Sequence, residues 1–160
     1  MSYQQEFEKL HQQYNGMVMQ LCLGFAQGSM MVAKDLSQDV FIHIWHALPR
    51  FQARSSYKTW IYRITTNTCL TYIRKAKKLP LDPLADKDAE IKFEGEEDHN
   101  YAALYKAIGQ LSNIDRILIM LVLDDLTYEE IGEVLGIKQT NLRVKIHRVK
   151  EKLKKIMSHE

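Results

Sequence analysis

The sequence has 160 residues, enough for one ordinary domain or two small ones, and 46% of them are hydrophobic, enough for a packed core. The formal net charge of +2 is too small to indicate a nucleic acid, a membrane surface or an acidic substrate as partner. The first ten residues have neither the basic start nor the apolar core of a signal peptide, and the longest apolar run, residues 117–123, is too short to cross a bilayer. We therefore expect a cytoplasmic protein without membrane insertion.

Apolar residues recur at helical spacing through most of the chain, and proline occurs only at positions 49, 80 and 83. These patterns predict an all-α protein. The first two helices are expected over residues 5–26 and 30–48, separated by Gly28 and Ser29. Cys22 lies in the first helix and Cys69 in a later one, and we expect buried free thiols, with a redox pair as the alternative.

The second predicted helix carries a polar outer face. An isoleucine between two aspartates on that face favours a contact with another protein, or else has no function. The residues on or beside this face are Asp35, Gln38, Asp39, Ile42 and His46. His43 and His46 have no third metal ligand near them in the sequence, so we expect no metal site.

A third helix is expected over residues 57–77, after a short loop at 51–56. One side of it carries a polar and cationic stripe at helical spacing: Trp60, Arg63, Asn67, Thr71, Arg74 and Lys78. Aromatic and cationic side chains together suit an unpaired nucleic-acid strand, because rings stack on bases while cations hold phosphates. The alternative is a solvated face with Trp60 in the core.

Residues 79–100 differ sharply from both flanks. They contain two prolines and eight acids against two lysines, whereas residues 1–78 contain ten Lys or Arg against four acids. This composition predicts an acidic, flexible linker. The fold class is therefore all-α with two small helical domains, 1–78 and 101–160. In the second domain, helices are expected over residues 101–110 and 113–123 before the final pair.

The last segment predicts a helix-turn-helix. Thr127 and Glu130 form a capping box, and Gly136 ends the first helix of the pair. The second helix begins near Gln139, and residues 138–155 contain eight Lys or Arg against one acid. Two short helices, a glycine turn and a basic second helix are typical of a motif that reads the major groove of DNA. An amphipathic helix with a merely solvated basic face is the simpler alternative.

The apolar seam of the second helix turns several residues outward near its start, among them Thr140, Arg143, Val144, His147 and Arg148. An exposed valine among cations is suited to a thymine methyl or a sugar, and it is equally common as an ordinary surface residue. Lys138 is a poor N-cap, which leaves the first backbone N–H groups free for a phosphate.

The motifs DLSQDVFIHIW and SSYKTWIYRITTNTCLTYIRKAKK, followed by an acidic linker and a helix-turn-helix, resemble the extracytoplasmic-function (ECF, group 4) sigma factors of bacterial RNA polymerase. The resemblance spans about residues 7–155. It implies a sigma region 2 domain over residues 1–78 and a region 4 domain over residues 101–160. The implied function is promoter recognition and DNA melting to initiate transcription, with no cofactor, metal or catalytic residue.

The resemblance also implies partners and sites. Core polymerase would dock its β′ clamp helices on Asp35, Gln38, Asp39 and Ile42, and its β flap on the second domain. The loop at residues 51–56 would hold a base flipped from the melted −10 element. The residues implied at the −10 element are Trp60, Tyr62, Arg63, Asn67, Thr71, Arg74, Lys75 and Lys78. Those implied at the −35 element are Gln139, Thr140, Asn141, Arg143, Val144, Lys145, His147 and Arg148. An anti-sigma factor is a further possible partner, and the linker is expected either to occupy the polymerase channel or to act as a tether.

Some residues depart from the family pattern. Lys138 stands where Ser or Pro is frequent, Thr140 and Asn141 where Gly and Thr are frequent, Val144 in place of a small residue, and Gly132 in place of alanine. These departures affect the choice of −35 bases more than the mechanism.

Two rival functions remain open from the residues alone. A stand-alone helix-turn-helix repressor or activator would bind duplex DNA by itself, usually as a dimer. An enzyme is weakly supported, because the sequence has no phosphate-binding loop, no G-x-S-x-G motif and no metal-ligand set.

Overall fold

The computed structural model describes residues 2–78 and 99–158, and these residues form α-helices and one short 3₁₀ helix, without strands. The elements are α1 (Tyr3–Phe25), α2 (Met30–Ala47), η1 (Leu48–Arg50), α3 (Tyr57–Lys78), α4 (His99–Gly109), α5 (Asn113–Leu123), α6 (Tyr128–Leu135) and α7 (Gln139–Ser158). The all-α prediction is confirmed, and each predicted helix is present with ends shifted by at most a few residues. Most of the predicted linker lies outside the described residues, and its last two positions already belong to α4.

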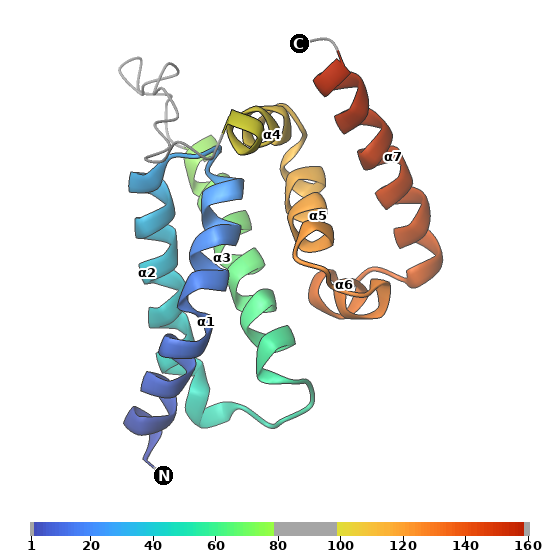
Figure 1. Cartoon of the computed structure of the whole chain (residues 1–160). Helices are drawn as coiled ribbons and strands as arrows, with labels where there is room; N and C mark the ends of the chain where they lie inside the picture. The colour runs from blue at the N-terminus through green and yellow to red at the C-terminus, as the bar shows by residue number, and fades with distance from the viewer. Residues whose placement is uncertain (1, 79–98, 159–160) are drawn as a thin grey trace.

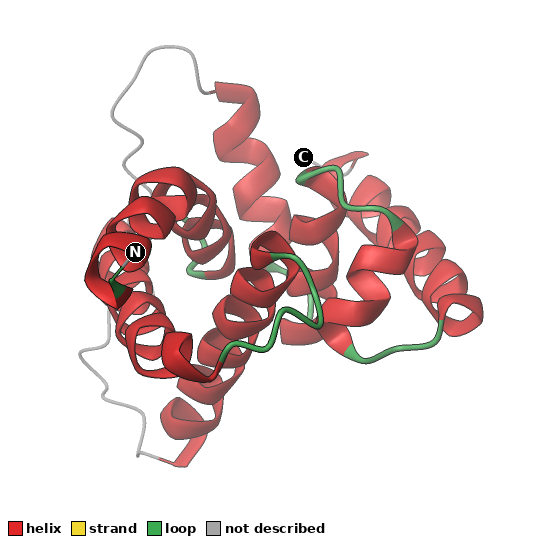
Figure 2. Ribbon diagram, turned by 90° about the horizontal axis from the view of Figure 1, so that it is seen from below, coloured by secondary structure: helices red, strands yellow, loops and turns green. Residues whose placement is uncertain are grey.

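The first half, residues 2–78, is a bundle of α1, α2 and α3 (Figures 1 and 2). Its helix starts are capped as the sequence chemistry requires, because Ser2 and Ser29 each accept a hydrogen bond from a backbone N–H of the first turn. Fully buried side chains from all three helices, such as Leu21, Ile44 and Ile61, meet in its core. The bundle therefore holds α3 with one side packed inward and another available to partners.

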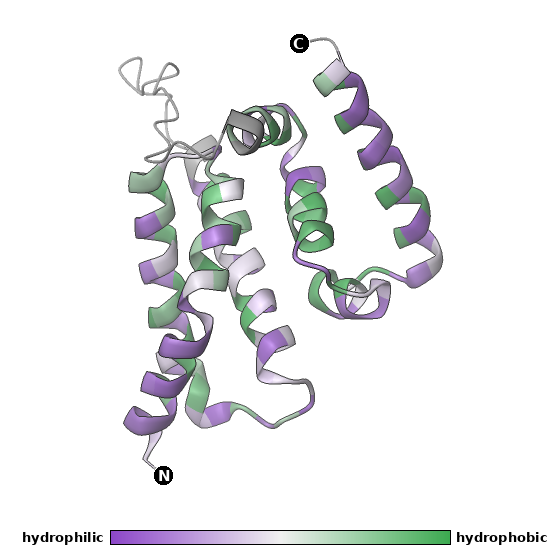
Figure 3. Cartoon of the chain, in the orientation of Figure 1, coloured by the Kyte–Doolittle hydropathy of each residue, from purple (hydrophilic) through white to green (hydrophobic). Residues whose placement is uncertain are grey.

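The second half, residues 99–158, is built around α5. This short helix has the sequence NIDRILIMLVL and buries six consecutive residues, 116–121, because neighbours surround it on several sides. Helix α7 lies on the outside of the second half and buries only a narrow seam, Leu142, Ile146 and Val149 (Figure 3). Its remaining surface is strongly polar, which fits a helix that presents a face to a partner.

The two halves pack against each other. Helix α5 lies against α1, and α6 lies against α3, so the buried hydrophobic residues of both halves form one continuous cluster. Gly24 of α1 makes room for this contact, since a Cβ there would meet the Met120 side chain at 2.3 Å. The sequence predicted two domains, but it did not predict this shared core.

A buried arginine joins the halves at the end of α1. Arg116 is 7% exposed and donates hydrogen bonds to the carbonyl oxygens of Phe25 at 3.0 Å and Gly109 at 2.9 Å, with a longer bond to Leu111. Phe25 ends α1 and Gly109 ends α4, so the guanidinium faces the negative ends of two helices. Burial lowers the pKa of this guanidinium, and its Nε has no hydrogen-bond partner among the described residues.

Candidate nucleic-acid interface

The start of α6 is fixed by the predicted capping box. Thr127 Oγ1 accepts from the Glu130 N–H at 3.1 Å, and Glu130 Oε1 accepts from the Thr127 N–H at 3.0 Å. The second of these bonds is the main reason that the pKa of Glu130 lies below its usual range. Leu126 and Ile131, the apolar residues on either side of the capping box, are both buried. The prediction of a capped first helix is confirmed.

The turn between α6 and α7 depends on two glycines. Gly136 has a φ of 69°, the left-handed conformation that ends a helix, and its N–H bonds to the Gly132 carbonyl at 2.8 Å. A Cβ on Gly132 would meet the carbonyl oxygen of Ile137 at 2.9 Å. Gly132, a departure from the family pattern, therefore allows a tight approach of the turn to α6.

Helix α7 presents its predicted contact residues to solvent. All eight residues expected at the −35 element are exposed: Gln139, Thr140, Asn141, Arg143, Val144, Lys145, His147 and Arg148. Val144 is 52% exposed, which makes it one of the more open large apolar side chains of the described residues. The Arg143 guanidinium lies 5.8 Å from the centre of the Tyr128 ring on α6, so this arginine is held by its partner helix.

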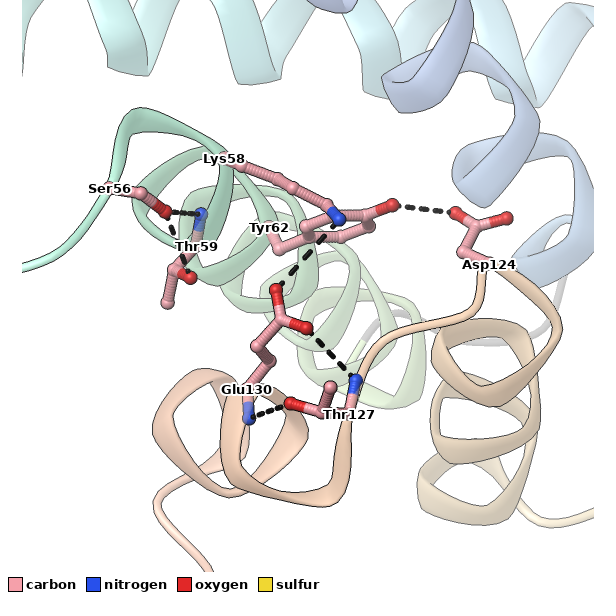
Figure 4. Close-up of polar contacts among 7 residues, drawn as sticks. All are labelled: Ser56, Lys58, Thr59, Tyr62, Asp124, Thr127 and Glu130. Carbon is pink, nitrogen blue, oxygen red and sulfur yellow. Dashed lines mark hydrogen bonds and ion pairs between the residues drawn. The ribbon is translucent and has the colours of Figure 1, made fainter.

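An aromatic corner stands where the loop after η1 enters α3. The rings of Phe51 and Tyr57 stack with their centres 4.5 Å apart, and the centres of the Phe51 and Trp60 rings are 4.7 Å apart. Ser56 caps α3 by accepting from the Thr59 N–H at 3.1 Å (Figure 4). The sequence indicated Trp60 and the loop but missed the two partner rings. Their only signal was their position at the two ends of the loop, because Phe51 begins it and Tyr57 follows it.

The next turns of α3 carry the polar stripe. Asn67, Thr71, Arg74 and Lys75 are exposed, and the Thr71 hydroxyl donates to the Asn67 carbonyl at 2.8 Å. The side chain of Lys78, which ends α3, lies outside the part of the chain that the structure describes. The exposed stripe begins at Asn67 and leads away from the aromatic corner.

Two residues expected at the −10 element, Tyr62 and Arg63, lie in the contact between the halves. Tyr62 is 2% exposed and its hydroxyl donates to Asp124 Oδ2 at 2.9 Å (Figure 4). The Arg63 guanidinium donates to the Glu133 carbonyl oxygen, also at 2.9 Å. In this arrangement Tyr62 offers no free surface to a nucleotide, because α6 covers this side of α3.

The contact between the halves also shifts the pKa values of residues that lie in it. Burial raises the pKa of Tyr62 well above its usual range, and the nearby Asp124 carboxylate adds to the rise. Burial likewise raises the pKa of Asp124, while the hydrogen bond from Tyr62 opposes that rise. Lys58 reaches Glu130 at 3.8 Å across the same contact, but both side chains are partly exposed, so this ion pair contributes little.

The outer face of α2 carries a groove of about 720 Å³ between α2 and the start of α1. Three of the four residues expected to contact core polymerase line it: Asp35, Gln38 and Ile42. Asp39 is exposed on the same helix. The groove also contains Phe7 and Trp45, whose rings lie 5.3 Å apart, and Trp45 is 44% exposed. Sequence reasoning missed these two rings, although an exposed tryptophan outside the apolar seam was a usable signal.

Both cysteines are buried and free, as predicted. Cys22 of α1 lies next to Cys69 of α3, and its side chain is the main reason that the pKa of Cys69 is raised far above the usual range. His43, considered as a metal ligand, instead contacts Thr68 at 3.0 Å. Among the described residues no group of three or more metal-ligating side chains occurs, and no helix is both long and apolar enough to span a bilayer.

Family models match both halves of the chain. The model for Sigma-70 region 2 matches residues 10–79, and the model for Sigma-70, region 4 matches residues 101–153. Together they cover most of the sequence in the order that the resemblance implies. The first match falls on α1–α3 and the second on α4–α7.

Several relatives and solved structures are similar over most of their length. The RNA polymerase sigma factor YlaC of Bacillus subtilis is 25% identical over 99% of this chain and 95% of its own. The ECF RNA polymerase sigma-E factor of Escherichia coli is 30% identical over 73% of this chain and 69% of its own. CnrH in complex with the cytosolic domain of CnrY superposes with a TM-score of 0.72 at 21% identity, covering 98% of this chain and 90% of that one. The sigma factor RpoE of Bartonella quintana, in complex with the anti-sigma factor NepR, gives 0.74 at 19% identity, covering 96% and 97%. The chain belongs to the ECF RNA polymerase sigma factors of the sigma-70 family, which direct the initiation of transcription.

Proposed function

We propose that this sigma factor docks on core polymerase through α2, reads the −35 element as duplex DNA with α7, and holds the melted −10 strand on α3. The observation that carries the proposal is a pair of separate cationic surfaces on different halves. One is the exposed stripe of α3 with Arg74 and Lys75, and the other is the exposed start of α7. A protein that reads only duplex DNA needs a single such surface.

Helix α7 has the composition of a reader of duplex DNA. Its cations, such as Arg148, would neutralise phosphates, whereas Asn141 and Arg143 are suited to base edges. Val144 would lie against a thymine methyl or a sugar. The contact with Tyr128 favours one orientation of the Arg143 guanidinium on the helix-turn-helix.

Helix α3 and the loop before it suit separated strands. Opening DNA costs about 1.4 kcal/mol of stacking per base-pair step. Stacking a base on an aromatic side chain returns about 1–3 kcal/mol, so a few such contacts offset the opening. Phe51, Tyr57 and Trp60 supply the rings next to the loop, where a flipped base would sit. Arg74 and Lys75 would follow the strand backbone.

The groove on α2 suits a helical partner. Phe7, Ile42 and Trp45 supply apolar anchors, and Asp35, Gln38 and Asp39 supply a polar rim. We assign this surface to the clamp helices of the β′ subunit, and we assign the β flap to the second half. The protein acts in the cytoplasm with its polymerase and catalyses no reaction of its own.

The proposed function requires the halves to separate. The positions −35 and −10 are about 25 base pairs apart, which is more than two turns of DNA at about 10–10.5 base pairs and 34–36 Å per turn. Tyr62 and Arg63 are engaged by the second half and become available only when α6 leaves α3. Core polymerase and promoter DNA would favour the open form by binding it more tightly. A partner of the anti-sigma class would favour the packed form, in which Tyr62 and Arg63 stay engaged by the second half.

Transcription with purified components tests the proposal. Core polymerase, this protein and a DNA library randomised over both promoter elements should yield transcripts that start at selected sequences. Polymerase alone should not select them. Asp39→Arg should abolish the transcripts without changing the helical circular-dichroism signal, because it reverses a charge on the polymerase surface. Failure of the wild-type protein to bind core polymerase would refute the proposal.

The rival function, a stand-alone duplex-binding regulator, makes a different prediction. Such a protein would elute from gel filtration as a dimer and would bind a specific duplex tightly without polymerase. A stand-alone regulator would have no use for the groove on α2 or for the face of α3 that the second half covers.

A further inference from the structure

A small hollow lies between α2 and α3, beside the exposed stripe. Its volume is about 210 Å³, and it is lined by His43, Ile64, Asn67, Thr68 and Thr71. Sites for drug-sized ligands span about 300–1,000 Å³, so this hollow suits a single ring system. His43, Asn67 and Thr71 are exposed even though the halves are packed together, so the hollow is open in this arrangement.

The hydrogen bonds around His43 fix the orientation of its ring. His43 Nδ1 lies 3.0 Å from Thr68 Oγ1. The Thr68 hydroxyl donates its only hydrogen to the Ile64 carbonyl at 2.7 Å, so toward the ring this hydroxyl is an acceptor. Nδ1 must therefore carry the hydrogen, and Nε2 of the neutral ring is left as an unprotonated acceptor. Because this acceptor points in a fixed direction beside the hollow, it can recognise a ligand that presents a hydrogen-bond donor there.

The other lining groups complete a site for a planar heterocycle. Ile64 supplies an apolar surface, and the exposed Asn67 amide supplies both a donor and an acceptor. One turn further along α3, the exposed Arg74 and Lys75 supply cations for the phosphates next to such a ring.

We propose that this hollow is a subsite for one unpaired nucleobase with an exocyclic amine, that is adenine, cytosine or guanine but not thymine, and that His43 Nε2 accepts from that amine. The proposal rests on the proposed function, since it needs a melted strand on α3. Thymine has no exocyclic amine and is disfavoured there, because the ring N3–H, its one donor on the pairing edge, lies between two carbonyl oxygens that would face the Nε2 lone pair. Thr68 is a positioning residue, because it contacts the ring of His43 and not the base.

The library transcription assay tests the subsite through base preference. His43→Ala should reduce the preference for adenine, cytosine or guanine over thymine about three- to tenfold at one position of the −10 region, the range of one hydrogen bond. His43→Gln should keep the preference, because its amide oxygen reaches the place of Nε2. His43→Asn keeps only the bond to Thr68 and should behave like alanine.

The positioning role has its own readout. Thr68→Val should weaken the preference at the same position, and Thr68→Ser should restore it. Rescue by asparagine but not by glutamine would assign His43 a purely structural role and overturn the subsite. An unchanged preference in His43→Ala, with wild-type selection intact, would overturn the subsite alone. If wild-type protein selects no −10 sequence, both the subsite and the proposed function fail.

Discussion

The hydroxyl of Tyr62 donates a hydrogen bond of 2.9 Å to the carboxylate of Asp124, which joins α3 of the first half to the residue that ends α5 in the second (Figure 4). Tyr62 belongs to the surface that we assign to the −10 strand. Under the proposed function the same side chain would serve the packed form of the free protein and the promoter-bound form in turn, and the bond to Asp124 would favour the packed form.

Removing the hydroxyl of Tyr62 should favour opening. In Tyr62→Phe the partly buried Asp124 carboxylate loses its donor, which costs about 1–3 kcal/mol in the packed form only. We expect the open fraction of the free protein to rise roughly five- to a hundredfold, as measured by energy transfer between dyes on exposed sites of α1 and α7. An unchanged transfer efficiency would show that the bond does not hold the halves together.

Packing of the halves should also depend on pH through Asp124. Its pKa is raised by burial in the packed form, so that form binds the proton more tightly than the open form does. The stabilisation of the packed form by this carboxyl is fully present below the ordinary Asp pKa near 3.8. It is lost as pH rises through the raised pKa of the packed form. Lys58 and Asp125 also act on this carboxyl, in opposite directions.

The variant Asp124→Asn separates the contribution of Asp124 to the pH dependence of packing from the contributions of other titrating groups. The asparagine oxygen still accepts from Tyr62 but carries no charge, so the variant should pack more tightly at pH 7 and lose the Asp124 part of the pH dependence. The pKa of Glu130 is lowered mainly by its own capping box, which both forms keep, so only its exposed ion pair with Lys58 adds a weak effect of opposite sign, and that effect remains in both proteins. The same energy-transfer pair read across pH 4–8 checks this. Identical profiles for the variant and the wild type would exclude Asp124 as the titrating group.

The stripe on α3 should matter for melting and not for docking. Arg63→Ala and Asn67→Ala should each reduce strand opening about five- to thirtyfold, the cost of one polar contact to a base or phosphate. Permanganate reactivity of promoter thymines measures opening, and co-purification measures polymerase affinity. Gln12→Ala, an exposed site on α1, is the control. Normal thymine reactivity in both variants would place these side chains away from the melted strand.

Replacing a cationic residue of α7 should show whether that residue contacts a DNA phosphate. Arg148→Ala should weaken binding of the holoenzyme to a −35 duplex uniformly across sequences and should lower the salt slope by about 1. Lys155→Ala, also exposed on α7 but beyond the proposed contact residues, should leave the slope unchanged. Equal slopes for Arg148→Ala and the wild type would put Arg148 off the DNA.

Local patterns made most of the fold predictable. The capping box at Thr127, the left-handed Gly136 and the seam of α7 each follow from interactions within a few residues, so spacing alone identifies them. The predicted exposure of the α7 contact residues is confirmed for the same reason, because a regular helix fixes which residues share a face. Their roles in DNA binding stay predictions.

Contacts between segments that lie far apart in the sequence could not be predicted from local patterns. Tyr62 reads as one more residue of an amphipathic helix, and only the packing of α6 on α3 turns it inward toward Asp124. The bond from Arg116 to the Phe25 carbonyl joins residues far apart in the chain, and no periodicity signals it. Trp45 and Phe7 likewise form a groove only because α1 and α2 lie side by side.

The separation of α1 and α7 tests the central claim most directly, because a single promoter can engage both halves only when they part. Spin labels on Gln13→Cys and Lys155→Cys, both exposed sites, give this distance by pulsed electron resonance, and the two native cysteines are buried. We predict one distance in the free protein, the one set by the packed halves, and a longer one in the complex with core polymerase and promoter. The same distance in both states would contradict the account.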